Sequence, residues 1–329
     1  MPKTVRVRPS GHQFPVERAE TILTAGLREG LNLDYHCGNG SCGECRARLL
    51  SGTVDSVCGS DFRFSPAEQA RGYILTCCST PSSDVEIEAH ETGSAAEIPF
   101  QELDARIAKL ERLSDEVMQV HVRTPRAGTL RFLAGQHATV MTNDGTFSRE
   151  LSLASCPCDG LHLRFHVRRN DGEPFSEYLF GRARKADTLN LKGPRGDFTL
   201  DEGSGRSLLF VAYGTGFAPV NSLIEHAIAL QWAQPIQLHW IAENAAGRYL
   251  ANYCRSWVDA LDEFDFHGWD AGAAGLRDSI AVIAREGAPL EEVDVYLALP
   301  RSVRDEARDA FLQAGLPASQ LRIDDLDHR

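Results

Sequence analysis

The spacing of hydrophobic and polar positions changes twice along the chain and divides it into three stretches. In the first stretch, apolar and polar residues alternate over residues 4–16 around a Pro-Ser-Gly-His turn, which is typical of a β-hairpin. Residues 19–29 carry apolar side chains at helical spacing, and Gly30 follows as a stop signal. Residues 46–54 and 84–89 are expected to form strands.

The second stretch begins after residues 90–98, which are small, polar and aperiodic like a linker. Short apolar segments then recur as far as residue 202, separated by Gly, Pro and Asn turns. This spacing predicts an antiparallel β-barrel. The predicted strands are residues 117–124, 137–141, 151–154, 161–167 and 189–191.

From residue 203 onward, strand and helix patterns alternate. A continuous apolar strand is followed by a glycine-containing loop and a helix, and two further strand–helix pairs come after it. This alternation predicts a parallel sheet covered by helices. The predicted strands are residues 208–212, 236–241 and 293–297, and the predicted helices are 219–230, 250–261 and 304–315.

Composition and charge narrow the class of protein. A chain of 329 residues exceeds the size of a single core, so several domains are expected. No apolar run approaches the roughly 20 residues of a membrane span. The charged N-terminal residues are not followed by an apolar region, so we expect no signal peptide and a cytoplasmic location. A net charge of −12 argues against nucleic-acid binding, which needs a basic surface.

The cysteines supply the first candidate chemistry, because six of the nine lie between residues 37 and 78. Clustered cysteines in a cytoplasmic chain indicate metal or redox chemistry more than disulfides. Cys37, Cys42 and Cys45 have the spacing C-x4-C-x2-C, which with a distant fourth cysteine is the plant-type [2Fe–2S] pattern. The intervening glycines let backbone N–H groups approach the sulfurs. Zinc is the alternative, although zinc usually takes two short Cys-x-x-Cys pairs.

The fourth cluster ligand is open among three cysteines. Cys77 and Cys78 are adjacent, so on an extended segment their side chains point to opposite faces and only one of them can ligate. Cys58 is also within reach by sequence. The cysteines of this group that do not ligate are expected to be small buried hydrophobic residues.

The barrel stretch contains a second group of candidate residues. A flavin dinucleotide needs a cation and backbone N–H groups for its pyrophosphate, and an apolar wall for its ring. Arg149 can supply the charge, and the amides around Phe175 and Ser176, at the start of a predicted helix, can supply the N–H groups. Taken alone, Arg-x-x-Ser is a common and weak motif. The flavin candidates are Arg149, Leu151, Ser152, His166, Val167, Phe175 and Ser176.

Together these motifs resemble the ferredoxin–NADP reductase-like family, in the arrangement with an N-terminal plant-type ferredoxin domain. The resemblance covers almost the whole chain. It implies Cys77 as the fourth ligand, because the run from Tyr73 to Cys77 is similar to the segment that closes the cluster site. It also implies FAD rather than FMN. Arg149-Glu-Leu151-Ser152 is similar to the family's Arg-x-Tyr-Ser motif, with a leucine in place of the tyrosine that packs on the flavin ring.

The resemblance implies a multidomain α+β and α/β fold. Residues 1–92 would form a β-grasp [2Fe–2S] ferredoxin domain, and residues 99–202 an antiparallel β-barrel FAD domain. Residues 203–329 would form a parallel α/β domain that binds NAD(P).

The nucleotide half departs from the family pattern. Gly214-Thr215-Gly216 resembles the loop that holds the NAD(P)H pyrophosphate at a helix N-terminus, but Tyr213 replaces the first glycine of that loop. Ala298 and Leu299 stand where the family has Cys-Gly, and a leucine would fill space that the nucleotide needs. The chain ends in residues 326–329 without the aromatic residue that often shields the flavin in relatives.

The resemblance implies an NAD(P)H-dependent reductase that passes electrons through FAD and the cluster to a partner, either an oxygenase component or a deoxysugar dehydrase. Direct hydride transfer requires no acid–base residue, so no catalytic side chain is assigned. Tyr213, Ala298 and Leu299 favour the alternative of an electron-transfer or interaction protein whose nicotinamide site is weakened or lost. Glu243 can bond a ribose hydroxyl and favour NADH, although a solvated loop carboxylate explains it equally well.

Overall fold

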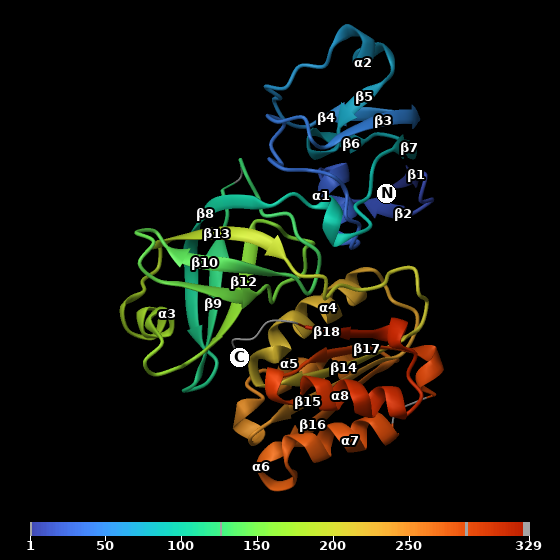
Figure 1. The fold of residues 1–329 in the computed structure, drawn as a ribbon. Coiled ribbons are helices and arrows are strands. Elements are labelled where there is room, and N and C mark those ends of the chain that lie inside the picture. Colours follow the sequence, from blue (N-terminus) through green and yellow to red (C-terminus); the bar gives the residue numbers. More distant parts are fainter. Residues whose placement is uncertain (1, 126, 287–288, 325–329) are drawn as a thin grey trace.

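The computed structural model describes residues 2–125, 127–286 and 289–324, and these residues form three units in chain order. Figure 1 shows the N-terminal unit (β1–β7) in blue to teal, the barrel (β8–β13) in teal through green to yellow, and the C-terminal unit (β14–β18) in gold to red. The C-terminal residues 326–329, expected to lack a shielding aromatic, lie outside the described residues.

The N-terminal unit contains a mixed five-stranded sheet, a separate two-stranded sheet and two short helices. Its elements are β1 (Lys3–Arg8), β2 (Gln13–Val16), α1 (Ile22–Arg28), β3 (Arg46–Ser51), β4 (Val54–Ser56), α2 (Pro66–Ala70), β5 (Tyr73–Leu75), β6 (Ser79–Pro81) and β7 (Val85–Glu88). The strand order is β2-β1-β7-β3-β5, with β1 and β7 parallel and the other neighbours antiparallel. Helix α1 begins where the Thr21 side chain accepts a hydrogen bond from the Thr24 N–H, and it buries Ile22 against the sheet. This is the β-grasp arrangement that the resemblance implied.

The barrel is built entirely from antiparallel neighbours. Its elements are β8 (Gln101–Arg112), β9 (Val117–Arg123), β10 (His137–Thr142), β11 (Ser148–Ser152), β12 (His162–Arg168), α3 (Pro174–Glu177) and β13 (Thr188–Arg195). The order is β11-β10-β13-β8-β9-β12, and a bridge between Leu153 and Phe165 joins the two edges of the sheet. The predicted barrel is therefore confirmed, although β8, its longest strand, was absent from the predicted set.

The C-terminal unit is a parallel sheet with helices on both faces. Its elements are β14 (Ser207–Tyr213), α4 (Phe217–Ala229), β15 (Ile236–Ala242), α5 (Ala251–Ala260), β16 (Phe264–Asp270), α6 (Ala271–Ala274), α7 (Leu276–Glu286), β17 (Val293–Ala298), α8 (Arg301–Gln313) and β18 (Leu321–Ile323). Alternate residues of β14 face opposite ways. Phe210 packs with α4 and α5, whereas Val211 packs with α7 and α8.

The order of this sheet is β16-β15-β14-β17-β18, so the chain reverses its direction of winding between β14 and β17. In open parallel sheets, ligands bind beyond the carboxyl ends of the strands at such a switch point. Strand β14 ends at Tyr213, which places the 214–216 loop at this position. Within the described ranges, no helix has the length and apolar character needed to cross a membrane.

Candidate functional site

Four cysteine sulfurs meet at one place in the N-terminal unit. The loop that follows α1 supplies Cys37, Cys42 and Cys45, and the turn after β5 supplies Cys77. The Sγ atoms of Cys37 and Cys42 are 3.2 Å apart, and those of Cys45 and Cys77 are also 3.2 Å apart. The backbone N–H of Glu44 donates to Cys42 Sγ at 3.4 Å. Four thiols supported by backbone N–H groups fit a [2Fe–2S] cluster, which takes two thiolates on each iron.

Hydrogen bonds favour the thiolate form at two of these positions. Burial acts to raise the pKa of Cys37, but hydrogen bonds from the Ser41 side chain and from backbone N–H groups lower it to about 6. The hydrogen bond with Cys77 lowers the pKa of Cys45 to about 7. The same bond, together with burial, raises the pKa of Cys77. Burial raises the pKa of Cys42. The thiolate is the form of cysteine that binds metal, so the lowered pKa values favour ligation at Cys37 and Cys45.

The expectation that Cys77 and Cys78 point to opposite faces of an extended segment was wrong, because Thr76–Cys78 forms a 3₁₀ turn in which their Sγ atoms are 3.8 Å apart. The two cysteines nevertheless have different closest partners. Cys77 Sγ faces Cys45, whereas Cys78 forms a disulfide with Cys58. The expectation that Cys58 and Cys78 are simply small buried hydrophobic residues was therefore wrong, because the fold brings their Cα atoms to 5.1 Å, within the range that a disulfide spans.

Gly43 shows why the cluster loop needs glycine. Its φ of +82° lies in the left-handed region, and a Cβ at this position would collide with the ring of Phe62. The Phe62 N–H in turn donates to the Gly40 carbonyl at 3.1 Å, which holds the 58–64 segment over the cluster loop. The tight loop predicted from the glycines therefore has a specific packing partner.

In the barrel, several donors converge on the carboxylate of Glu173. The N–H groups of Phe175 and Ser176, in the first turn of α3, donate to it at 3.0 and 2.8 Å. Arg149 Nη1 lies 3.3 Å from the same carboxylate. One cation and two amides thus already hold an anion, which is the donor set that a flavin pyrophosphate needs. Sequence reasoning missed Glu173, although an acidic residue directly before a proline is a recognisable start of a helix.

The side chains of most other flavin candidates lie inside the barrel. Leu151, Val167 and Phe175 belong to its hydrophobic core. Ser152 is buried, and the Ser176 hydroxyl accepts a hydrogen bond from the Asn170 N–H at 2.9 Å. The side chains of these residues therefore pack inside the barrel, and only their backbone groups are available to contact a cofactor.

His166 lies between the barrel and the C-terminal unit. Its Nε2 is 2.9 Å from the Gln119 amide nitrogen, and its Nδ1 is 3.0 Å from the Tyr249 hydroxyl. With the Gln119 amide donating to Nε2, this network assigns the proton of the neutral ring to Nδ1. Burial, with smaller contributions from Arg164 and His121, lowers the pKa of His166 to about 3. The ring is therefore an uncharged part of the contact between two units.

A cavity of about 590 Å³ lies at the carboxyl ends of β14 and β15, between the C-terminal unit and the barrel. Gly214 and Thr215 line it from one side, and Arg168 and Glu116 line it from the barrel. Gly216 is buried at the start of α4. The size is within the range of roughly 300–1,000 Å³ that small-molecule pockets have.

Two departures from the family pattern have different consequences at this cavity. Tyr213 lines the cavity, and its hydroxyl donates to Glu243 Oε1 at 2.5 Å. Burial and this hydrogen bond together raise the pKa of Tyr213 to about 12. Leu299 is fully buried and packs with Val303 and Phe311. Neither Leu299 nor Ala298 is among the residues that line the cavity.

Comparison with known proteins matches family models to parts of the first two units. Residues 5–82 match the 2Fe-2S iron-sulfur cluster binding domain, and residues 104–200 match the oxidoreductase FAD-binding domain. The chain is 34% identical over 265 residues to the xylene/toluene monooxygenase electron transfer component XylA of Pseudomonas putida, covering 80% of this chain and 73% of that protein.

Two further relatives are similar over nearly the full length. The CDP-6-deoxy-L-threo-D-glycero-4-hexulose-3-dehydrase reductase of Yersinia pestis is 28% identical over 331 residues, with 98% of each chain covered. The crystal structure of the Amycolatopsis cytochrome P450 reductase GcoB superposes with a TM-score of 0.62 at 24% identity, with 99% of each chain covered. This structural likeness shows that the two chains share a fold.

Proposed function

The chain belongs to the ferredoxin–NADP reductase-like family, in the arrangement with an N-terminal plant-type [2Fe–2S] ferredoxin domain, and from this premise we propose that it is an NAD(P)H-dependent reductase. When bound, FAD and the cluster supply the redox chemistry that carries electrons from NAD(P)H to a partner protein. The proposal rests on one contact between the barrel and the N-terminal unit. The Thr129 N–H and hydroxyl donate to the His36 carbonyl at 3.1 and 3.0 Å, so the barrel is bonded directly to the residue before Cys37.

We assign the units of the protein as follows. Residues 1–92 form the ferredoxin domain, 99–202 the FAD-binding domain and 203–329 the NAD(P)-binding domain. The proposed cluster ligands are Cys37, Cys42, Cys45 and Cys77, and the proposed cofactor-binding residues are Arg149, Leu151, Ser152, His166, Val167, Phe175, Ser176, Gly214, Thr215 and Gly216. These assignments are supported by the donors around Glu173, by the four converging sulfurs and by the cavity beside Gly214.

The protein's own contribution to the reaction is positioning. Arg149 and the amides of α3 would bind the flavin pyrophosphate in place of the Glu173 carboxylate. The 214–216 loop would bind the nucleotide pyrophosphate at the start of α4. Glu243, at the end of β15, would bond a ribose hydroxyl and disfavour a 2′-phosphate, which favours NADH over NADPH. No side chain is required as an acid or a base, since hydride transfer needs only contact between the two rings.

The proposed acceptor is a protein, either an oxygenase component or a deoxysugar dehydrase, as in the names of the relatives from Pseudomonas and Yersinia. A cytoplasmic location is part of this proposal, because reducing compartments keep cluster cysteines available as thiolates. The net charge of −12 suits a partner surface with basic groups, since complementary charge guides association between electron-transfer proteins.

The test is an anaerobic visible spectrum of the purified holoprotein before and after one equivalent of NADH, repeated with NADPH. We expect the flavin and cluster bands to bleach together, and to do so with NADH at lower concentration than with NADPH. A spectrum that lacks a flavin or cluster contribution would contradict the cofactor assignment itself.

One observation favours a second candidate function. The Tyr213 hydroxyl bonds Glu243 inside the cavity, and this bond occupies the carboxylate that would bind a ribose. If this contact persists, the protein is an electron carrier whose nicotinamide site is weakened and which receives its electrons from another donor. In the same spectrum, flavin and cluster bands that are present but unchanged by NADH and NADPH would establish this second function.

A further inference from the structure

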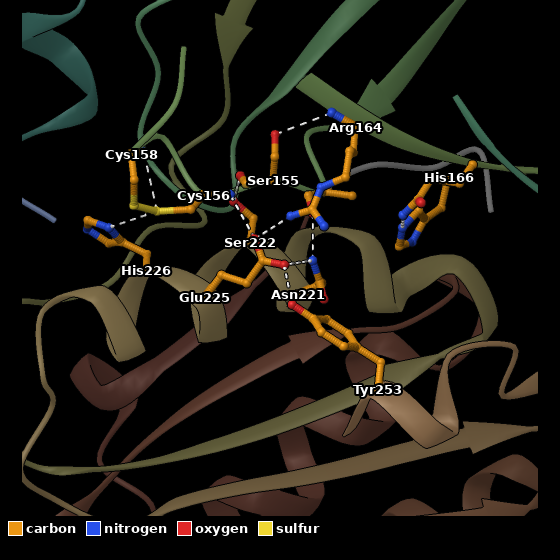
Figure 2. A network of polar contacts seen from close by, with 12 residues as sticks. Ser155, Cys156, Cys158, Arg164, His166, Asn221, Ser222, Glu225, His226 and Tyr253 are labelled. Atoms are coloured by element: carbon orange, nitrogen blue, oxygen red, sulfur yellow. Dashed lines mark hydrogen bonds and ion pairs between the residues drawn. A yellow bond between two sulfur atoms is a disulfide. The ribbon is translucent and has the colours of Figure 1, made fainter. Parts of the chain in front are cut away.

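Two cysteines separated by one proline face a buried histidine where the barrel meets the C-terminal unit. Cys156 and Cys158 lie in the loop between β11 and β12, and His226 lies on α4. Figure 2 shows the three side chains pointing toward one another, with a disulfide between the two cysteines. Cys156 Sγ is 3.9 Å from His226 Nδ1, and one ligand atom from each of the three residues lies within 4.8 Å of the others.

The histidine is held in the way that metal-binding histidines are held. His226 is 2% exposed, and its Nε2 lies 2.9 Å from Glu202 Oε1. A carboxylate on one ring nitrogen keeps the proton there, so the other nitrogen is free to donate its lone pair to a metal. Here that other nitrogen is Nδ1, the atom that faces Cys156. Glu202 is itself fixed by the Asn32 amide of the N-terminal unit at 3.2 Å.

The loop that carries the cysteines is also fixed. The Cys156 N–H donates to Glu225 Oε2 at 3.1 Å, and Arg164 forms an ion pair with the same carboxylate. The Tyr253 hydroxyl donates to the other oxygen of Glu225, a contact drawn in Figure 2, and the donor and acceptor oxygens are 3.0 Å apart. The Ser222 hydroxyl donates to the Ser155 carbonyl at 2.6 Å. The cysteine pair and the histidine are therefore held opposite each other by contacts that do not involve the sulfurs.

We propose that, once the disulfide is reduced, Cys156, Cys158 and His226 Nδ1 bind one zinc ion at this junction. Two thiolates and one imidazole are preferred zinc ligands, and a fourth position is left for water or another group. With Zn–S of about 2.3 Å and Zn–N of about 2.0 Å, a sulfur and a nitrogen on a tetrahedral zinc lie about 3.5 Å apart. The observed 3.9 Å between Cys156 Sγ and His226 Nδ1 is close to that separation.

The disulfide and the zinc site are alternative states of the same residues. A small dithiol gives two electrons and two protons to the disulfide, so that the S–S bond breaks, two thiols form and the dithiol becomes a disulfide. Zinc then replaces the two thiol protons, which are released to solvent. The ion would connect the barrel loop to α4, next to the Asn32 contact with the N-terminal unit. All three units would therefore meet beside it.

The experiment uses the holoprotein, reduced anaerobically with dithiothreitol, incubated with zinc sulfate and then desalted. Zinc, iron and acid-labile sulfide are measured together, so that zinc in a damaged cluster site is recognised by loss of iron. We expect one zinc per chain with full iron content. We also expect an X-ray absorption spectrum with two sulfur neighbours at about 2.3 Å and one nitrogen at about 2.0 Å. The oxidised holoprotein should bind no zinc.

Three variants test the assignment. Cys158→Ser should lose the zinc. Cys254→Ala removes another cysteine, which lies on α5 and is buried against the sheet, and this variant should retain the zinc. Because His226 is buried, the carboxylate that holds it is changed instead, and Glu202→Gln should weaken zinc binding about 10- to 100-fold. Zinc retained by Cys158→Ser, zinc present only where iron is lost, or a reduced holoprotein that binds no zinc would each overturn the proposal.

Discussion

Adjacent residues with different sulfur partners allow the cluster site to be tested one side chain at a time. Cys77 faces Cys45, and Cys78 is bonded to Cys58. Cys77→Ser should therefore abolish or severely disrupt the cluster, because it removes one of four thiolates. Cys78→Ser, the matched control, should retain iron and sulfide in full. The measurement is iron and acid-labile sulfide per chain, and a cluster lost in Cys78→Ser but kept in Cys77→Ser would reverse the assignment.

A buried histidine gives the protein a defined dependence on pH. The pKa of His166 is about 3 in the folded state, against an ordinary value of about 6.5. Between these values the unfolded chain takes up a proton that the folded chain does not, so stability falls as the pH is lowered from 6.5 toward 3. Between pH 6.5 and 5.0 the wild type should lose about 2 kcal/mol more free energy of unfolding than His166→Gln.

Urea unfolding of the two proteins at both pH values, followed by circular dichroism, measures this difference. Glutamine keeps a hydrogen-bonding side chain opposite Gln119 and Tyr249 but does not titrate. The same decline in both proteins would show that other groups cause the acid sensitivity and that His166 is not buried in the neutral form.

The sequence pointed to the proposed cluster ligands more readily than to the proposed flavin residues. Cluster ligands repeat at fixed spacings because one short loop must place several sulfurs around the same irons. The anion site around Glu173 depends instead on how α3 packs beside β11. This packing brings Arg149 into contact with Glu173, which is 24 residues later in the sequence. The Cys58–Cys78 disulfide was missed for the same reason, since sequence cannot say which distant cysteines the fold brings together.

At the level of elements, the predicted strands that were found carry continuous or alternating apolar residues, and the two longest strands that were missed, β8 and β16, bury few residues. Strand β9 was predicted from residues 117–124 and has only one exposed residue. Strand β8 buries only Ala105 and Ile107 among its twelve residues, because much of it faces solvent. Strand β16 lies at the sheet edge with an equally polar pattern. Strands are predicted from the regular spacing of their buried apolar residues, so strands that bury few residues are not detected.

The loop after β14 supplies a prediction about nucleotide binding. Tyr213 donates to Glu243 at 2.5 Å, so its hydroxyl competes with a ribose for that carboxylate. Tyr213→Phe removes the competing bond and should lower the KM for NADH by about 2- to 10-fold, which is the effect of one net hydrogen bond. Steady-state reduction of ferricyanide at varied NADH measures it. An unchanged KM with a lower kcat would show instead that the hydroxyl positions the nucleotide.

At the scale of the whole molecule, polar contacts rather than a shared hydrophobic core join the N-terminal unit to the barrel. Arg131 Nη2 donates to Asp34 Oδ1 at 2.6 Å and to the Thr92 hydroxyl at 2.8 Å, and its side chain is 14% exposed. Such contacts between units have no period in the sequence, which explains why the pattern gave three stretches but not their arrangement. Asp34 is three positions before Cys37, so we expect these contacts to affect electron transfer between the barrel and the N-terminal unit.

Substitution of Arg131 should therefore slow reduction of the cluster without slowing reduction of the flavin. Arg131→Ala removes hydrogen bonds to a charged partner worth about 1.5–3 kcal/mol, so the ratio of docked to undocked N-terminal units should fall about 10- to 100-fold. In anaerobic stopped-flow mixing with NADH, the flavin band should bleach at the wild-type rate while the cluster band bleaches more slowly. Arg169→Ala, which removes an exposed barrel arginine paired with Asp171, is the matched control and should leave both phases unchanged. Equal slowing of both phases in Arg131→Ala would mean that this contact stabilises the barrel itself and does not set the position of the cluster.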